Sequence, residues 1–342
     1  MGGSALGDAT DGRRRSPEEY EAIKKRVLEV VTPLYDRVKV PRHIADKEDF
    51  GDLDVMVQGV RNPKHVEIIR EKLQSKKDHR NSDNHSYEFE GFQVDISNAG
   101  PNDFDMFCVY HEFGDMMGLL GMQASYVGLK LGQQGLYLRL ESKDAGEENN
   151  SLIKPYELIL TTDPLKAFAY LGCDVQQYQR GFQTQLEMAE FLCRTKFFRP
   201  YVFRPSAAKY DARRRLLHRP MCIFFRDYLA LHFPEQMLEE FQPPPELIPD
   251  IKAIRDQAIR DFGKQAERDT WEVKARRFLG LRHKLPGSLL MEVSGYKGPA
   301  LGEFKKAFLA QWSDKDAFED FLLASTDEQI RTRLQAFADG YG

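Results

Sequence analysis

The spacing of apolar residues predicts a helix and then two strands near the start of the chain. Residues Ser16 to Glu19 combine a capping box with a proline at the first helical position. Apolar residues then recur at three- and four-residue spacing, which predicts an amphipathic helix to about Thr32. A first strand is expected over residues 37–44, and a second strand over residues 52–57.

The same patterns continue to about residue 160. Proline near a helix start, alternating apolar residues and glycine turns mark the further elements. In chain order we expect a helix over 63–76, a polar loop over 77–86, a hairpin over 87–95, a short helix over 114–121, a second hairpin over 126–140 and a polar linker over 141–150.

After residue 160 the apolar spacing becomes helical. Asp163-Pro164 and Pro220 each mark the start of a helix. Gln242 to Pro245 contains three consecutive prolines and is a rigid break. Thr326 begins a capping box that opens the last helix. The second half of the chain is therefore predicted to be helical.

These patterns divide the chain into three predicted regions. Residues 1–15 are polar and rich in Gly and Arg, which is typical of a disordered tail. A mixed-sheet domain follows over 16–160, and a helical domain over 161–342. The predicted fold class is α+β.

Composition indicates a soluble protein. At 342 residues the chain is long enough for two domains. No apolar run approaches the roughly 18 residues needed to cross a bilayer, so we expect no membrane association. The four cysteines are widely spaced, which fits reduced thiols in the cytoplasm or nucleus and argues against a structural zinc site.

Charge is distributed unevenly along the chain. Residues 1–160 contain 28 acidic and 21 basic residues, whereas residues 161–342 contain 25 acidic and 28 basic residues. From Asn81 to Leu120 there are eight acids and no Lys or Arg. A bound metal ion would be a reasonable counter-charge for this acidic stretch, although solvated loops would also explain it.

Three of the acids in the first half form a candidate metal site. A turn at Gly51 opens directly into the strand that carries Asp52 and Asp54. Because successive side chains of a strand point to opposite faces, these two carboxylates share one face. They repel each other unless they share a proton or a divalent cation. Asp95 lies in a later strand-like run, and an oxygen-only site of this kind suits Mg²⁺ or Mn²⁺.

The run Gly51-Asp52-Leu53-Asp54-Val55-Met56-Val57, followed by a helix and then Phe92-Gln93-Val94-Asp95-Ile96, resembles the nucleotidyltransferase superfamily, which includes DNA polymerase beta and poly(A) polymerases. The resemblance covers roughly residues 18–100. It implies a mixed-sheet nucleotidyltransferase domain followed by a helical domain. It also implies that Asp52, Asp54 and Asp95 hold two magnesium ions, which organise in-line attack by an acceptor hydroxyl on the α-phosphate of a nucleoside triphosphate.

The chain departs from the family pattern where the triphosphate should bind. Family members usually carry a glycine-serine pair at a helix start before Asp-x-Asp, and its N–H groups cradle the phosphates. Neither Gly nor Ser occurs between Val38 and Phe50. We therefore expect Lys47 to bind the phosphates, with Arg42 as the reserve and the Gly51 turn as part of the nucleotide-binding site. The alternative is an inactive nucleotidyltransferase-fold domain that binds nucleic acid or protein.

Two further interpretations of the acids stay open. Asp52 and Asp54 can belong to an exposed acidic turn, with Asp95 unrelated to them. Asp103-Phe104-Asp105 is a second Asp-x-Asp and the second candidate metal site. We rank it lower because no third carboxylate follows it in a strand at a comparable distance.

A basic and aromatic segment is the candidate acceptor site. Residues 194–226 contain ten Lys and Arg and one acid, Asp211, interleaved with Phe and Tyr. This pattern suits a nucleic-acid groove, although arginine stems packed over core aromatics would produce it too. Arg213, Arg214 and Arg215 fan around a helix and cannot all face a core, so we assign them to acceptor binding. The expected partners are a nucleoside triphosphate and an RNA 3′ end, while the preferred nucleotide and the oligomeric state stay open.

Overall fold

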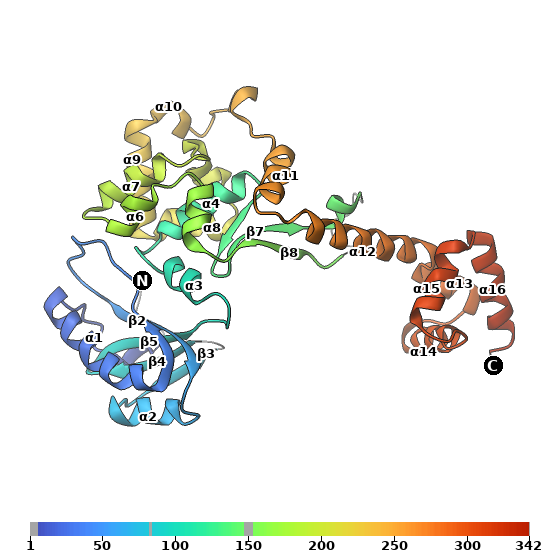
Figure 1. Ribbon diagram of the computed structural model, residues 1–342, viewed down its shortest axis with the longest axis horizontal. Coiled ribbons are helices and arrows are strands. Elements are labelled where there is room, and N and C mark those ends of the chain that lie inside the picture. Colours follow the sequence, from blue (N-terminus) through green and yellow to red (C-terminus); the bar gives the residue numbers. More distant parts are fainter. Residues whose placement is uncertain (1–5, 82–83, 147–152, 342) are drawn as a thin grey trace. The chain divides into compact units, whose positions relative to one another are not determined.

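The computed structural model describes residues 6–81, 84–146 and 153–341, and the contacts within the chain divide it into two units (Figure 1). Unit 1 comprises Met1–Leu138 and Ile159–Phe262, and unit 2 comprises Arg139–Leu158 and Gly263–Gly342. The structure is α+β, with a mixed five-stranded sheet, a three-stranded sheet and a helical region at the C-terminal end. This confirms the predicted fold class. No helix of the described ranges is long and apolar enough to span a membrane.

The five-stranded sheet of unit 1 carries the acids of the candidate site. Its strands are β1 (Tyr35–Lys39), β2 (Asp52–Val60), β3 (Asp78–Asn81), β4 (Asn84–Phe89) and β5 (Phe92–Asn98). They lie in the order β1-β2-β5-β4-β3. The central strands β2 and β5 run parallel, and every other neighbouring pair runs antiparallel. The connection that parallel neighbours require includes α2 (His65–Lys72).

Helices α1 (Pro17–Val31) and α2 pack on one face of this sheet (Figure 1). The predicted capping box starts α1: the Glu19 N–H donates to Ser16 Oγ at 3.3 Å, and the Ser16 N–H donates to Glu19 Oε2 at 2.9 Å. Alternate residues of β2 and β5 share a hydrophobic core with the two helices. The residues between them, including the acids, therefore point to the opposite face.

The other elements of unit 1 are mainly helical. Its helices after α2 are α3 (Phe104–Tyr110), α4 (Met116–Tyr126), α5 (Pro164–Tyr170), α6 (Val175–Arg180), α7 (Gln185–Cys193), α8 (Tyr210–His218), α9 (Pro220–His232), α10 (Pro234–Met237) and α11 (Ile251–Asp261). A second sheet has the order β6-β7-β8, with strands β6 (Lys130–Gly132), β7 (Gly135–Leu140) and β8 (Tyr156–Thr161). The division between the units falls within β7 and within β8. The predicted hairpin over 126–140 corresponds to β6 and β7.

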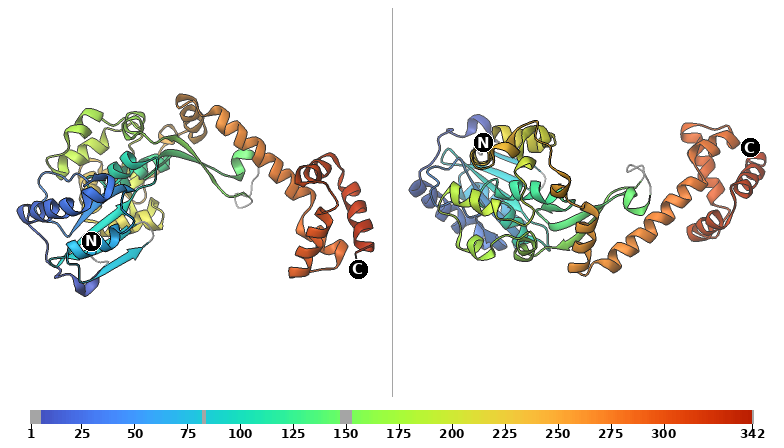
Figure 2. Two further views of the ribbon diagram at one scale, coloured as in Figure 1. Left: turned by 60° about the horizontal axis from the view of Figure 1, so that its bottom comes forward. Right: turned by 90° about the horizontal axis from the view of Figure 1, so that it is seen from above.

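Unit 2 has a core of its own. Its helices are α12 (Gln265–Lys284), α13 (Gly287–Ser294), α14 (Gly298–Leu309), α15 (Lys315–Ala324) and α16 (Asp327–Asp339). Helices α13 to α16 gather into a bundle in all three views (Figures 1 and 2). Phe304 and Phe308 are fully buried at its centre, together with Ile330 and Leu334. The capping box predicted at Thr326 begins α16.

Several predicted elements have other bounds in the structure. The polar loop predicted over 77–86 is wrong, because its described residues include β3 and the start of β4. The strand predicted over 37–44 ends at Lys39, two residues before Pro41, which has no N–H to donate to a sheet. The helix predicted over 114–121 begins at Met116 and continues to Tyr126. The linker predicted over 141–150 contains a short 3₁₀ helix at Ser142–Ala145, and its last residues lie outside the described ranges.

The disordered tail predicted over 1–15 is wrong for residues 6–15, and residues 1–5 lie outside the described ranges. The Leu6 side chain is fully buried. Arg15 is 3% exposed, and its backbone exchanges two hydrogen bonds of 2.9 Å with Phe50, just before β2. Buried contacts over this segment offset the loss of chain entropy on ordering. Composition alone does not reveal these contacts.

The boundary between units also differs from the boundary predicted at residue 160. Helices α5 to α11 belong to the same unit as the five-stranded sheet. Backbone hydrogen bonds join them to the loop before β2, for example from the Ala45 N–H to the Phe182 carbonyl at 3.0 Å. The change from mixed to helical patterning therefore falls within one folded unit.

Candidate functional site

The three predicted acids lie on neighbouring strands and on the same face of the sheet. Asp52 and Asp54 come from β2, and Asp95 comes from β5. Asp54 pairs directly with Asp95 in the parallel register, and Asp52 pairs with Gln93. The alternation that places Leu53 in the core fixes the acids on the face opposite to α1 and α2. The sequence prediction that these residues come together is consistent with this register.

The electrostatics of the acids reflect their burial and mutual repulsion. Burial raises the pKa of Asp54 to about 7, and the charges of Asp52 and Asp95 act in the same direction, whereas Lys47 opposes them. Burial also raises the pKa of Asp95, although hydrogen bonds from Ser86 and Gln93 counteract part of this increase. A divalent cation between the acids would remove the repulsion.

The acids offer oxygen ligands only, which is the donor set that Mg²⁺ and Mn²⁺ prefer. Over residues 6–81, 84–146 and 153–341, however, no group of three or more His, Cys, Asp or Glu side chains has the spacing of a metal site. Asp52, Asp54 and Asp95 would therefore have to draw closer together to hold an ion. Repelling carboxylates behave in this way when a cation screens them.

A pocket with several cations is formed by residues of α1, the loop before β2 and residues 180–183. Its lining includes Phe50, which lies two residues before Asp52. Its volume is about 440 Å³. The Lys47 ammonium lies 4.3 Å from the centre of the Phe50 ring. Burial lowers the pKa of Lys47, while the charges of Asp52 and Asp54 favour its protonated form. The charged and aromatic side chains that line the pocket are Glu21, Lys24, Arg42, His43, Lys47, Arg180, Phe50, Phe113 and Phe182. Lys24 Nζ forms an ion pair with Glu21 Oε1 at 2.6 Å.

Arg42, the reserve phosphate ligand, is engaged in another role. Its Nε and Nη2 donate to Glu112 Oε2 at 2.9 and 2.6 Å, and its Nη1 donates to the carbonyls of Tyr178 and Gln179. The guanidinium also lies over the rings of Phe113 and Tyr178. These bonds occupy Arg42, so it holds the loop before β2 to α6 rather than offering its charge to a phosphate.

Glu112 is a residue that the sequence analysis did not single out. Its side chain is fully buried, forms an ion pair with Lys39 at 3.0 Å and accepts a hydrogen bond from the Tyr178 hydroxyl at 2.6 Å. It belongs to the acidic stretch over 81–120, for which a metal ion was considered as counter-charge. Three acids of this stretch have basic partners from outside it: Glu112 pairs with Lys39 and Arg42, Asp105 with Arg37, and Glu90 with Arg26. These three acids need no metal ion as counter-charge, whereas Asp95, in the same stretch, belongs to the candidate metal site.

The second Asp-x-Asp does not form a strand pair of carboxylates. Asp103 is the residue before α3, and Asp105 lies in the first turn of that helix. Asp105 forms an ion pair with Arg37, whose guanidinium lies 4.2 Å from the Phe104 ring centre. Arg37 therefore compensates the charge of Asp105, and no metal ion is needed for that purpose.

The cations of the basic segment 194–226 have different roles. Arg204 is 8% exposed and donates to four backbone carbonyls, and Arg213 donates to the carbonyls of Pro205 and Ser206. Arg214 and Arg215 are exposed on α8, which packs chiefly against α9. The segment therefore combines structural arginines with an exposed basic surface.

No protein-family model matches this chain, and no curated protein matches it. The likeness to the nucleotidyltransferase superfamily consequently rests on the Asp-x-Asp motif, the later Asp95 and the register that brings these residues side by side.

Proposed function

We propose that this chain is a nucleotidyltransferase that depends on Mg²⁺ or Mn²⁺ and transfers a nucleoside monophosphate to an acceptor hydroxyl, with an RNA 3′ end as the acceptor. The observation that carries the proposal is the direct pairing of Asp54 with Asp95 on adjacent parallel strands, with Asp52 two residues before Asp54 on the same face. Pairs of buried titratable groups whose charges disfavour one another are typical of functional sites.

The three acids divide into two roles in the proposed reaction. Asp52 and Asp54 would hold the ion shared with the triphosphate, and Asp95 would complete the site of a second ion. When bound, the ions polarise the α-phosphate and stabilise the attacking and leaving oxygens. A carboxylate oxygen of Asp95 would accept the proton of the attacking hydroxyl.

The pocket with several cations supports a triphosphate as substrate. Lys47 and Arg180 line it, together with Lys24, which is paired with Glu21, and the aromatic rings of Phe50 and Phe182 offer apolar surface. Lysine side chains can neutralise phosphates where a chain lacks the glycine-serine pair whose N–H groups usually do so. Since Arg42 is bonded to Glu112, Lys47 is the principal phosphate ligand of the proposal.

Lys47→Ala is expected to raise the KM for the triphosphate about tenfold or more, because a hydrogen bond to a charged group contributes roughly 1.5–3 kcal/mol. The affinity for the acceptor should change little. Steady-state kinetics with each substrate varied in turn measures both effects. Lys25→Ala is the matched control, since Lys25 is an exposed residue of α1. An unchanged KM for the triphosphate would show that Lys47 does not bind the phosphates and would favour other cations of the pocket, such as Arg180.

The reaction itself can be tested by incubating the protein with each of the four α-labelled nucleoside triphosphates, Mg²⁺ or Mn²⁺, and RNA. The proposal predicts labelled RNA with at least one triphosphate. Absence of label in every RNA, small-molecule and protein fraction would contradict nucleotidyl transfer. RNA binding without transfer would favour the inactive binding module.

Exposed arginines of α8 provide a test of the acceptor. Arg214→Gln with Arg215→Gln should weaken RNA binding uniformly across sequences and reduce the salt dependence by about one unit of slope per lost phosphate contact. Arg213 is left in place because it holds backbone carbonyls of the preceding turn. Filter binding at several salt concentrations measures both quantities.

The matched control for the α8 variant is Lys274→Gln with Lys305→Gln, which removes two exposed cations of unit 2. If the α8 variant binds RNA with the affinity and slope of the control, the basic segment is structural. A small molecule or a protein side chain would then be the better candidate acceptor.

A further inference from the structure

Gln93 is a buried amide next to one of the proposed metal ligands. It lies two residues before Asp95 on β5, so both side chains point to the acidic face of the sheet. Its exposed fraction is 3%. Gln93 Nε2 donates to both carboxylate oxygens of Asp95, at 3.0 and 2.8 Å. Across the sheet, Gln93 pairs in register with Asp52. Its side chain is thus a neighbour of two of the three acids.

The backbone of Leu6 contacts the oxygen of the Gln93 amide. The Leu6 N–H donates to Gln93 Oε1 at 3.4 Å. A donor on one side and a carboxylate on the other require the amide oxygen to face Leu6 and the amide nitrogen to face Asp95. In the reversed orientation, the amide oxygen would face the Asp95 carboxylate and the amide NH₂ would face the Leu6 N–H, so neither hydrogen bond could form. The two contacts therefore select one orientation.

Leu6 is fixed by contacts on both its side chain and its backbone. The side chain is fully buried, and Lys77 Nζ donates to the Leu6 carbonyl at 3.0 Å. We call residues 6–15 the N-terminal strap. The Asp11 N–H donates to the Gly91 carbonyl at 2.9 Å, at the turn between β4 and β5. The strap is thereby joined to the strand that carries Gln93 and Asp95.

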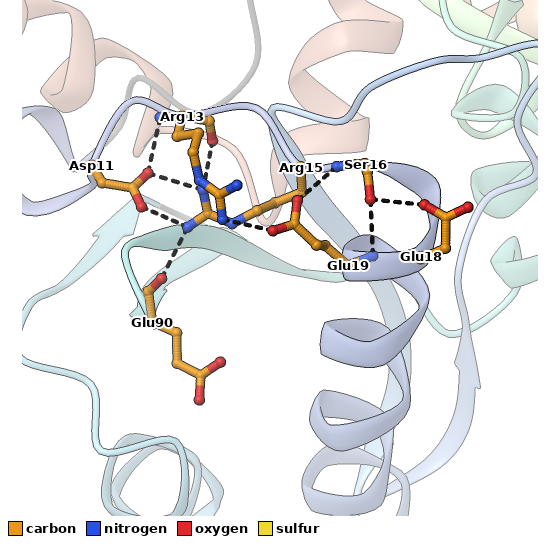
Figure 3. A network of polar contacts seen from close by, with 7 residues as sticks. All are labelled: Asp11, Arg13, Arg15, Ser16, Glu18, Glu19 and Glu90. Carbon is orange, nitrogen blue, oxygen red and sulfur yellow. Dashed lines mark hydrogen bonds and ion pairs between the residues drawn. The ribbon is translucent and has the colours of Figure 1, made fainter.

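The other end of the strap is held by Arg15 (Figure 3). Arg15 Nη2 donates to Asp11 Oδ2 at 2.7 Å and to the Glu90 carbonyl at 2.9 Å. The Arg15 backbone pairs with Phe50, two residues before Asp52. The strap therefore connects the start of β2, where Asp52 lies, with the start of β5, the strand that carries Asp95.

We propose that Gln93 is a positioning residue for Asp95 and that the N-terminal strap holds the Gln93 amide in its working orientation. The inference rests on the proposed function, in which Asp95 is a metal ligand. Carboxylate ligands are commonly oriented by hydrogen bonds from neighbouring groups, and removal of such a group costs about 10- to 100-fold in metal affinity or activity. Each carboxylate oxygen has a further lone pair, so the amide leaves room for a cation.

The contacts from Leu6 to Gln93 and from Gln93 to Asp95 can be tested without any assumption about activity. The side-chain NH₂ signals of Gln93 are assigned in a ¹⁵N–¹H spectrum by their absence from Gln93→Leu. Leu6→Asp should expel the buried side chain of residue 6 and shift these signals, whereas the volume-conserving Leu6→Met should leave them in place. Signals that are identical in wild type and Leu6→Asp would overturn the role of the strap.

Mn²⁺ binding, followed by electron paramagnetic resonance of the full chain, tests the consequence for the site. Gln93→Leu and Leu6→Asp should each weaken Mn²⁺ binding about tenfold. Leu6→Met and Gln58→Leu are the matched controls and should bind Mn²⁺ like wild type. Gln58 is a strand glutamine on β2 whose amide donates to the Gly100 carbonyl.

The outcomes separate this inference from the proposed function. A wild-type chain that binds no Mn²⁺ would overturn both. A wild-type chain that binds Mn²⁺ with the same affinity as Gln93→Leu and Leu6→Asp would overturn the positioning role alone. If Gln93→Leu does not fold, as judged by circular dichroism, Leu6→Asp still decides between these outcomes because the rest of the strap remains intact.

Discussion

Asp54→Asn is expected to abolish nucleotidyl transfer while leaving the melting temperature of the metal-free protein unchanged or higher. Loss of a carboxylate ligand removes several kcal/mol of transition-state stabilisation by the ion, which corresponds to a fall in kcat of about a thousandfold or more. The amide keeps the shape of the side chain. Asp95→Asn should have the same effect on transfer.

The expected direction of the stability change follows from the pKa of Asp54. Burial, with the charges of Asp52 and Asp95, raises this pKa to about 7 from an ordinary value of 3.8. An acid with a raised pKa in the folded state lowers stability as the pH rises from its unfolded pKa to its folded pKa. Asp54 should therefore lower the stability of the metal-free wild type, relative to Asp54→Asn, increasingly between about pH 4 and pH 7.

Melting curves at pH 5 and pH 8 in the presence of a chelator measure this difference, and the labelled-triphosphate assay measures transfer. Asp46→Asn is the control, because Asp46 is an exposed acid of the loop before β2. Transfer at a near wild-type rate in Asp54→Asn would remove Asp54 from the site. Transfer lost together with a large fall in melting temperature would indicate a structural role instead.

The acids could be predicted from the sequence because their arrangement follows from local rules. Alternation along a strand places Asp52 and Asp54 on one face, and a capping box marks the start of α1. Both signals lie within a few residues. That Asp95 joins the other two acids was expected only from the family resemblance, and its pairing with Asp54 was not predicted, since the register between two strands is not a local property.

The roles of the arginines could not be predicted, because they depend on partners far away in the sequence. Arg42 and Glu112 are 70 residues apart, and Arg204 donates to carbonyls 34 to 37 residues further on. An arginine that reaches such partners has the same local pattern as an exposed one. The sequence therefore left open whether the arginines of residues 194–226 bind nucleic acid or are structural, and it offered Arg42 as a reserve phosphate ligand although Arg42 is bonded to Glu112.

The N-terminal strap illustrates the same limit. A polar segment rich in Gly and Arg is typical of a disordered tail. Burial of Leu6 and of the Arg15 guanidinium gives residues 6–15 fixed positions beside the acidic strands. One apolar and one basic residue are too few to alter a compositional prediction, although their contacts decide the structure of the segment.

Glu112→Gln is expected to lower the free energy of unfolding of unit 1 by about 3 kcal/mol, because breaking a buried ion pair leaves the remaining charge without compensation at a cost of roughly 3–5 kcal/mol. The lower end of this range applies because the partner side chains Arg42 and Lys39 are 35% and 42% exposed, so water partly solvates their charges when Glu112 is replaced. Hydrogen exchange of amides in β1 and α6, which adjoin the cluster, measures the loss.

Two comparisons show whether the loss is specific to this cluster. Trp271 and Trp312, the two tryptophans of the chain, lie in unit 2, so their fluorescence should report an unchanged unfolding transition. Glu190→Gln breaks the exposed pair with Arg194 and should cost less than about 1 kcal/mol. Equal effects of Glu190→Gln and Glu112→Gln would contradict the assignment.

The pH dependence gives the buried Glu112 cluster its sharpest test. Burial alone would raise the pKa of Glu112, but hydrogen bonds from Arg42 and Tyr178, with the charges of Lys39 and Arg42, lower it below its ordinary value of 4.5. The stabilisation is therefore fully present above about pH 4.5 and is lost as the pH falls through the lowered pKa. The difference between wild type and Glu112→Gln should shrink from pH 6 to pH 3. A difference that stays constant over this range would show that the ionised carboxylate does not stabilise the link between β1 and α6.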